Sequence, residues 1–299
     1  MSKLDPQLER VARERMSDEF SDYILYGRLS KTVDSEGEFA RTLVTLSETE
    51  RKHFEFWKKY APTAEPKLDR AKLYWILFLR KLFGLTFAAR YLDRHESGVV
   101  GKYRSLAGLI PEEDRKAFDD MVADEVEHER AFEMSIESSA VQYISFVVLG
   151  LADALVEITG IHAGSLGIYD KTEIAGLAGV IAGAAASLAM ASAAFAQAKQ
   201  GFKGSARLSA LYTGVSYFIT AIILATPYFL TSDMVLALSA SLTLAVIIVT
   251  LTTYYSTVVA NKPFFKDYVE ILLILFAVTV ALYAFGSIIH AEIPGIRIT

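Results

Sequence analysis

The residues of this sequence best suited to chemistry are glutamates and histidines that recur at helical spacing in its first half. Glu50 lies three positions before His53, and Glu125 lies three positions before His128. Residues three apart on a helix share a face, so each pair can point at one spot. A single pair in so charged a segment would more often be a solvated helix surface. Two pairs favour half-sites for a metal ion, because carboxylate and imidazole groups are metal ligands.

A second pattern lies upstream of each pair. Glu19 is followed seven positions later by Tyr26, and Glu96 is followed seven positions later by Tyr103. Seven residues make nearly two helical turns, so each glutamate shares a helix face with its tyrosine. The same order of elements thus occurs twice, which indicates a weak internal repeat. We expect Glu19 and Glu96 to be ligands, and the two tyrosines to be hydrogen-bond partners that orient ligands.

These residues can meet if their helices form a bundle. Periodicity and turn residues predict four helices, over about 4–31, 35–60, 67–106 and 111–138. One Glu from each of two helices and a Glu-x-x-His from each of the other two is the ligand set of two-metal carboxylate bundles. Oxygen and imidazole ligands in this number suit iron or manganese better than structural zinc. Iron is the better prediction, and Asp93, three positions before Glu96, could be an additional ligand.

Charge is concentrated in the first half of the chain. Residues 1–138 contain 27 of the 35 acidic and 23 of the 30 basic residues. A domain boundary is therefore expected near 138–141, between a domain of residues 1–138 and a domain of residues 139–299. The net charge of −5 gives no reason to expect a nucleic-acid partner. The chain has no cysteine, which excludes disulfides and thiolate metal ligands.

The second half is a series of apolar segments, at about 141–166, 173–198, 207–230, 233–257 and 265–290. A membrane span needs roughly 20 apolar residues, because lipid cannot satisfy backbone hydrogen bonds. Each segment meets that length. Small residues such as Gly176, Gly179 and Gly183 predict a central position for the second segment. The predicted fold is all-α, with an N-terminal four-helix bundle followed by a five-span transmembrane helical domain.

Basic residues between the apolar segments lie mostly on one side. The second-to-third and fourth-to-fifth connections carry five of them: Lys199, Lys203, Arg207, Lys262 and Lys266. The opposite side has Lys171 and Arg297. Cytosolic loops are enriched in Lys and Arg, so the N-terminal domain is expected in the cytosol and the C-terminus on the opposite side. The first residues lack the apolar core of a signal peptide, which agrees with this orientation.

One stretch of the first half has an ambiguous pattern. Residues 72–92 are rich in Leu, Phe and Trp and also contain Arg80, Lys81 and Arg90. This composition is typical of a helix on the membrane surface or of one packed on the transmembrane domain. A sixth span is the weaker alternative, because three basic side chains are costly in lipid.

Ionisable residues inside the first apolar segment favour a cation pathway. The alternative is that one carboxyl group lies near the aqueous end of the segment and the other is neutral or paired with a polar neighbour. Asp153 and Glu157 are four positions apart and share a helix face, where a lone charge costs several kcal/mol in lipid. His162 further along could relay protons or could lie at the membrane interface. Met190 in the second segment offers a thioether, although a methionine in a membrane helix is more often a packing residue than a ligand.

The membrane half resembles the vacuolar iron transporter family over all five segments. The resemblance rests on Gly150-Leu151-Ala152-Asp153-Ala154-Leu155, Gly160, Gly164 and Ala189-Met190-Ala191. It implies that Asp153 and Met190 bind the transported ion, and that the protein is a homodimer with its pathway at the subunit interface. Two features depart from the family: its Gly-Glu pair is replaced by Ala193-Ala194, and its long acidic cytosolic hairpin is reduced to residues 199–207. Glu157 could supply the missing membrane carboxylate.

The N-terminal half resembles the rubrerythrin branch of the ferritin-like family. Membrane-tethered relatives that carry a domain similar to the vacuolar iron transporters form a known class. The resemblance implies seven metal ligands: Glu19, Glu50, His53, Asp93, Glu96, Glu125 and His128. The cysteine-ligated rubredoxin unit of that branch is missing here, so a self-sufficient peroxidase is less expected.

These patterns predict a transporter that moves Fe²⁺, or Mn²⁺, out of the cytosol in exchange for protons. Its cytosolic di-iron site would bind, sense or oxidise the metal, with ferroxidase activity as one outcome, and manganese or zinc could substitute for iron. The alternative is a membrane-anchored di-iron oxidase or peroxidase. Asp153 and Glu157 argue against it, because an anchor has no use for carboxylates in lipid. The expected partners are divalent metal ions, protons, the bilayer and a second copy of the chain.

Overall fold

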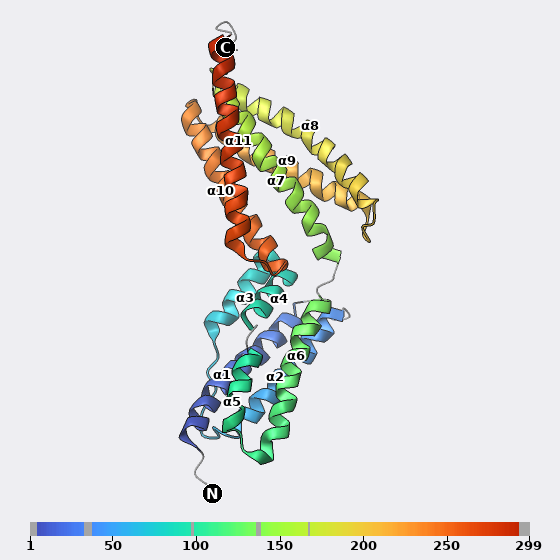
Figure 1. The fold of residues 1–299 in the computed structure, drawn as a ribbon, viewed down its shortest axis with the longest axis vertical. Helices are drawn as coiled ribbons and strands as arrows, with labels where there is room; N and C mark the ends of the chain where they lie inside the picture. The colour runs from blue at the N-terminus through green and yellow to red at the C-terminus, as the bar shows by residue number, and fades with distance from the viewer. Residues whose placement is uncertain (1–4, 33–37, 97–98, 136–138, 167, 293–299) are drawn as a thin grey trace. The chain divides into compact units, whose positions relative to one another are not determined.

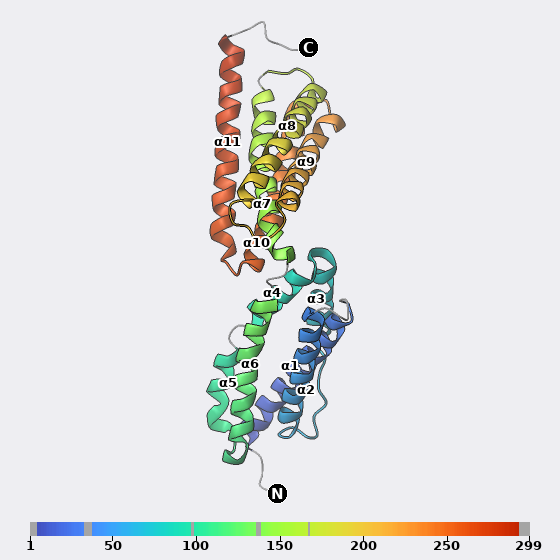
Figure 2. The same ribbon diagram turned by 90° about the vertical axis from the view of Figure 1, so that its right-hand side faces the viewer.

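The computed structural model describes residues 5–32, 38–96, 99–135, 139–166 and 168–292, apart from some side chains within these ranges. The described residues form eleven α-helices and two short 3-10 helices, so the predicted all-α class is confirmed. The chain divides into two compact units, Met1–Ser138 and Ser139–Thr299. Figures 1 and 2 show α1, α2 and α6 of the first unit side by side.

Six helices make up the first unit: α1 (Pro6–Ser30), α2 (Glu38–Lys58), α3 (Arg70–Phe83), α4 (Leu85–Glu96), α5 (Val99–Leu106) and α6 (Arg115–Ser135). The start of α1 follows from its sequence, because Asp5 accepts a hydrogen bond from the Gln7 backbone N–H and Pro6 occupies the first turn. Asp69 caps α3 in the same way by accepting from the Lys72 N–H.

The prediction of one helix over residues 67–106 is wrong, because three helices occupy this stretch. The first break is at Gly84, whose φ of 87° lies in the left-handed region that a side chain disfavours. The Gly84 N–H closes the end of α3 by donating to the Arg80 carbonyl. The chain then restarts at once as α4. Apolar periodicity continues across this point in the sequence, which is why the pattern indicated a single helix.

One apolar core joins α1, α2, α5 and α6. Trp57 of α2 lies at its centre and is fully buried. Its ring centroid is 5.9 Å from that of Tyr103 of α5 and 6.1 Å from that of Phe118 of α6, and Met16 of α1 belongs to the same cluster. Four helices thus pack around shared aromatic side chains, which holds the polar residues on their inner faces close together.

The second unit consists of five long helices: α7 (Ser139–Ser165), α8 (Thr172–Ala198), α9 (Ala206–Leu230), α10 (Met234–Val259) and α11 (Phe264–Glu292). All five are long and apolar enough to cross a membrane, and they match the predicted segments to within a few residues. The chain is therefore a multi-pass membrane protein. No further helix of this kind occurs among the described residues. With 14 residues, α3 extends about 21 Å, too short for the hydrocarbon core of a bilayer.

The helices α7 and α9, rather than α8, are the most buried of the second unit. In each of the former, 39% of the most apolar window is buried, against 28% for α8. The prediction of a central second segment is therefore wrong. Its small residues nevertheless act as expected on one face: an added Cβ on Gly183 would stand 2.5 Å from the Ala221 Cβ of α9. Small side chains thus let α8 approach closely on one side only.

This close approach predicts a specific coupling between two positions. Gly183→Ala would place two Cβ atoms 2.5 Å apart, so we expect it to lower stability by roughly 1–3 kcal/mol. Ala221→Gly removes the opposing Cβ at a helix-propensity cost of about 1 kcal/mol. The double variant should lose less stability than the two single variants lose together. Melting temperatures measured by circular dichroism in detergent give the three losses. Strict additivity of the two substitutions would contradict the predicted contact.

Candidate metal centre

Four potential ligands from three helices meet inside the first unit. Glu19 comes from α1, Glu50 and His53 come from α2, and Glu125 comes from α6. Each offers one ligand atom, and these atoms all lie within 4.8 Å of one another. Glu19, Glu50 and His53 are buried, and Glu125 is partly buried. The three-residue spacing on α2 brings Glu50 and His53 together, as expected for residues on one helix face.

The His53 ring lies among the carboxylates. Its Nδ1 is 3.1 Å from Glu125 Oε1, 3.5 Å from Glu50 Oε2 and 3.7 Å from Glu19 Oε2. Its other nitrogen, Nε2, is 3.4 Å from Asp124 Oδ2. One imidazole nitrogen therefore faces three carboxylates, while the other faces a fourth acidic side chain at the edge of the cluster.

The electrostatics of the cluster favour a positive charge at its centre. Burial and the neighbouring charge of Glu50 raise the pKa of Glu19 well above its usual value. Burial lowers the pKa of His53, but the adjacent carboxylates of Glu125, Glu19 and Glu50 more than offset this and raise it to about 12. Buried carboxylates that lack a compensating cation are costly. A divalent cation at this place would supply that charge, so the donor set fits a metal ion.

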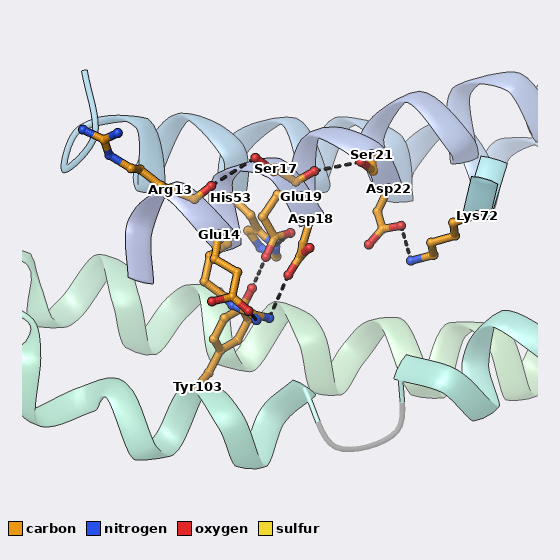
Figure 3. Close-up of polar contacts among 11 residues, drawn as sticks. Arg13, Glu14, Ser17, Asp18, Glu19, Ser21, Asp22, His53, Lys72 and Tyr103 are labelled. Carbon is orange, nitrogen blue, oxygen red and sulfur yellow. Dashed lines mark hydrogen bonds and ion pairs between the residues drawn. The ribbon is translucent and has the colours of Figure 1, made fainter. Parts of the chain in front are cut away.

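Tyr103 orients one of these carboxylates. Its hydroxyl, on α5, donates a hydrogen bond to Glu19 Oε1 of α1, as Figure 3 shows. The sequence pattern paired Tyr103 with Glu96 on the same helix face, whereas this bond crosses between helices. Tyr26, the other expected tyrosine, is fully buried on α1. Hydrogen bonds to a ligating carboxylate restrict its rotation and favour one binding geometry.

The remaining expected ligands are the side chains of Asp93, Glu96 and His128, which lie outside the described residues. Of the seven, the described part of the structure thus places four in one cluster. Asp124 was not predicted, although it contacts His53 Nε2. Its position directly before Glu125 is a weak signal, because adjacent residues on a helix point in directions about 100° apart. Only the packing of α2 against α6 brings it to the ring.

In the second unit, the described contacts connect Glu157 rather than Asp153 to a partner. The Tyr217 hydroxyl of α9 donates to Glu157 Oε2 at 2.5 Å. Asp153 lies one turn earlier on α7 and is partly buried. Met190 of α8 packs against the apolar cluster that contains Tyr217. Tyr217 was not predicted, because its role depends on α7 and α9 lying side by side.

His162 is enclosed by the helix bundle. Its side chain is fully buried on α7, and its ring centroid is 4.2 Å from that of Tyr228 of α9. A Cβ on Gly179 of α8 would stand 2.3 Å from the His162 Nε2, so only glycine leaves room for the imidazole. Within the described part of the chain, neither ring nitrogen has a hydrogen-bond partner.

Comparison of the chain with protein-family models, with curated proteins and with solved structures finds no match. The fold and the cluster therefore define a class of protein and not a family. It is an all-helical multi-pass membrane protein whose N-terminal helical unit carries a buried cluster able to hold a metal ion: Glu19, Glu50, His53 and Glu125.

The cluster predicts that divalent metal binding depends on Glu50. We expect Glu50→Gln to lower the affinity of the full chain for Mn²⁺ by roughly 10-fold or more, because it removes a buried negative ligand. Glu48→Gln is the matched control, since Glu48 lies two positions away on α2, is exposed and pairs with Arg51. Calorimetric titration of purified protein in detergent measures both. Equal affinities in the wild type and in Glu50→Gln would refute the proposed role of the cluster.

Asp22, one turn beyond Glu19 on α1, is a second acidic residue of this unit with a shifted pKa. Its Oδ1 is 2.5 Å from the Lys72 Nζ of α3, an ion pair visible in Figure 3. Burial raises the pKa of Asp22 to about 7; Lys72 opposes this shift, and the charge of Glu50 adds to it. Because the folded-state pKa exceeds the ordinary value of 3.8, ionisation of Asp22 destabilises the fold as the pH rises towards 7.

This shift predicts how Asp22→Asn changes the pH dependence of stability. Between pH 5 and pH 8 the wild type should lose roughly 1–3 kcal/mol relative to the variant, because only the wild type must ionise the buried carboxyl group at position 22. The difference in melting temperature, measured in detergent with a chelator present, should therefore move in favour of the variant as the pH rises. A difference that is constant with pH, or that moves the other way, would contradict the shifted pKa.

Proposed function

We propose that this protein moves Fe²⁺ or Mn²⁺ out of the cytosol in exchange for protons, and that a ferritin-like N-terminal domain of residues 1–138 binds the metal on the cytosolic side. The observation that carries the proposal is the presence of acidic metal-type ligands in both units of one chain. The first unit has the buried glutamate and histidine cluster. The second has Asp153 and Glu157 on a helix of membrane-spanning length.

The membrane carboxylates support a cation pathway. Asp153 and Glu157 share one face of α7. A charge in lipid costs several kcal/mol unless it is paired or hydrated, so carboxylates at such positions usually have a function. Tyr217 donates a hydrogen bond to Glu157 and so gives this carboxylate a polar partner from a neighbouring helix. A carboxylate that loses its proton to bind a cation, and regains it on release, exchanges metal for protons. By resemblance to the vacuolar iron transporters, Asp153 and Met190 would bind the transported ion.

In the N-terminal domain, Glu19, Glu50, His53 and Glu125 would hold the metal, and Tyr103 would fix the orientation of Glu19. The proposal also includes the three other expected ligands of a two-metal site: Asp93, Glu96 and His128. Iron bound by such ligands would donate electrons to dioxygen or peroxide. The carboxylates of this chain would attract the cation, exclude competing anions and release protons as metal binds.

Positive-inside charge supports a cytosolic N-terminal domain and a C-terminus on the opposite side. From the resemblance to the transporter family, we also propose a homodimer with the pathway at the subunit interface. A membrane-anchored di-iron oxidase remains the second candidate. It would share the N-terminal cluster but would have no use for Asp153 and Glu157 as ionisable groups.

The transport proposal predicts the effect of neutralising Asp153. In proteoliposomes under an imposed pH gradient, Asp153→Asn should abolish flux of Mn²⁺ reported by a metal-sensitive dye. The substitution preserves size and removes a burial cost, so the fold should persist. Asp170→Asn is the control, since Asp170 is an exposed acid of the α7–α8 connection, and it should transport at the wild-type rate. Met190→Leu should be milder, because it removes a thioether of similar volume.

Three outcomes would count against this proposal. Full flux through Asp153→Asn would reject the pathway. Wild-type flux that ignores the pH gradient would reject proton exchange. Absence of flux in the wild type, combined with metal-dependent oxygen consumption that requires Glu50, would instead favour the anchored oxidase.

A further inference from the structure

The helix α3 exposes an apolar face on the first unit. Leu73, Ile76 and Leu79 are buried against the unit, whereas four large apolar residues on the other side are exposed: Tyr74 (62%), Trp75 (47%), Phe78 (51%) and Leu82 (59%). We call these four residues the α3 patch. Helices at the surface of a soluble unit normally have a polar outer face. Exposed aromatic residues in this number indicate a surface that another phase or molecule covers.

The four residues form one continuous stripe. At 100° per residue they fall within an arc of about 100° on the outer face of α3. The Trp75 and Phe78 rings stack with centroids 5.7 Å apart. The Trp75 Nε1 donates to the Tyr91 hydroxyl of α4 at 3.3 Å, so the polar edge of the indole has a partner while its ring remains exposed. Tryptophan and tyrosine with one apolar and one polar end are typical of membrane interfaces.

Basic residues flank the stripe. Arg70 and Lys81 are exposed and lie along one edge of it, and α3 contains no acidic residue. This local positive charge stands out in a chain whose net charge is −5. Lysine and arginine near an apolar helix face bind the anionic headgroups of lipids.

The helix is firmly held by its unit. Lys72 pairs with Asp22 of α1, and the Arg80 guanidinium donates to the Thr32 carbonyl. The inner face is buried, so α3 can present its patch without unfolding. It is also too short to cross a bilayer, as its length of about 21 Å shows.

We propose that α3 lies along the headgroup region of the bilayer, with the α3 patch inserted at the boundary of the acyl chains and with Arg70 and Lys81 on anionic headgroups. The bilayer is the favoured occupant because five membrane-length helices belong to the same chain, so this unit is covalently tethered to a membrane. The charge, the Trp–Tyr pair and the length of α3 all match an interfacial helix. The inference does not depend on metal binding or transport.

The tryptophans of the chain make a direct test possible. There are two, Trp57 in the core and Trp75 in the patch, and none in the second unit. Full-length Trp57→Phe in nanodiscs with anionic lipid therefore reports on Trp75 alone. Lipids brominated near the top of the acyl chain should quench most of its fluorescence, and aqueous acrylamide should quench little. Full-length Trp75→Phe is the matched control, and its buried Trp57 should respond to neither quencher.

Two patterns would overturn the proposal. Strong acrylamide quenching without bromolipid quenching places the patch in water. Protection from both quenchers shows that protein covers it, either the rest of the chain or a second copy. If Trp57→Phe does not fold, the difference between the wild type and Trp75→Phe isolates the same signal. Charge reversal in Arg70→Glu/Lys81→Glu should reduce bromolipid quenching in nanodiscs that contain anionic lipid, and unchanged quenching would reject the role of the two basic residues.

Discussion

Buried negative charge is the constraint on which the described part of the N-terminal unit depends. Three helices each bring a carboxylate to one place, where water is excluded and repulsion between the carboxylates is strong. Protonated His53 offsets that repulsion with a single positive charge, which explains its raised pKa. A divalent cation would offset the same repulsion with two positive charges. Packing around Trp57 brings the carboxylates together, because α1, α2, α5 and α6 share this aromatic core and the ligands lie on the inward faces of their helices.

The same constraint operates under stricter conditions in the membrane unit. Lipid offers no hydrogen bonds, so a carboxylate there depends on neighbouring helices. Tyr217 provides such a partner for Glu157. The helices α7 and α9 approach closely at Gly150, where an added Cβ would stand 2.3 Å from the Thr213 carbonyl oxygen, and this brings them near enough for the contact. His162 shows how tightly this space is filled, since its ring fits only because residue 179 lacks a side chain.

The cluster was only partly predictable. Glu50 and His53 share a face of one helix, and this local periodicity can be read from spacing alone. That Tyr103 would reach Glu19, and that Asp124 would reach His53, depends on the register between helices far apart in the chain. The break at Gly84 was missed for a related reason. Apolar periodicity runs through it, and a glycine in a helical pattern does not by itself say whether the chain turns.

By itself, the sequence determined the apolar segments and the helical spacing of the candidate ligands. Five apolar stretches of about 20 residues or more predict membrane helices, because a helix satisfies all the backbone hydrogen bonds of one segment within that segment. The helical repeat likewise set which glutamates and histidines share a face. Only the tertiary structure decided which faces meet. It made α7 and α9 more buried than the small-residue helix α8, and it left the aromatic stripe of α3 exposed. These outcomes depend on how complete surfaces fit together, a property of pairs of helices that no single segment carries.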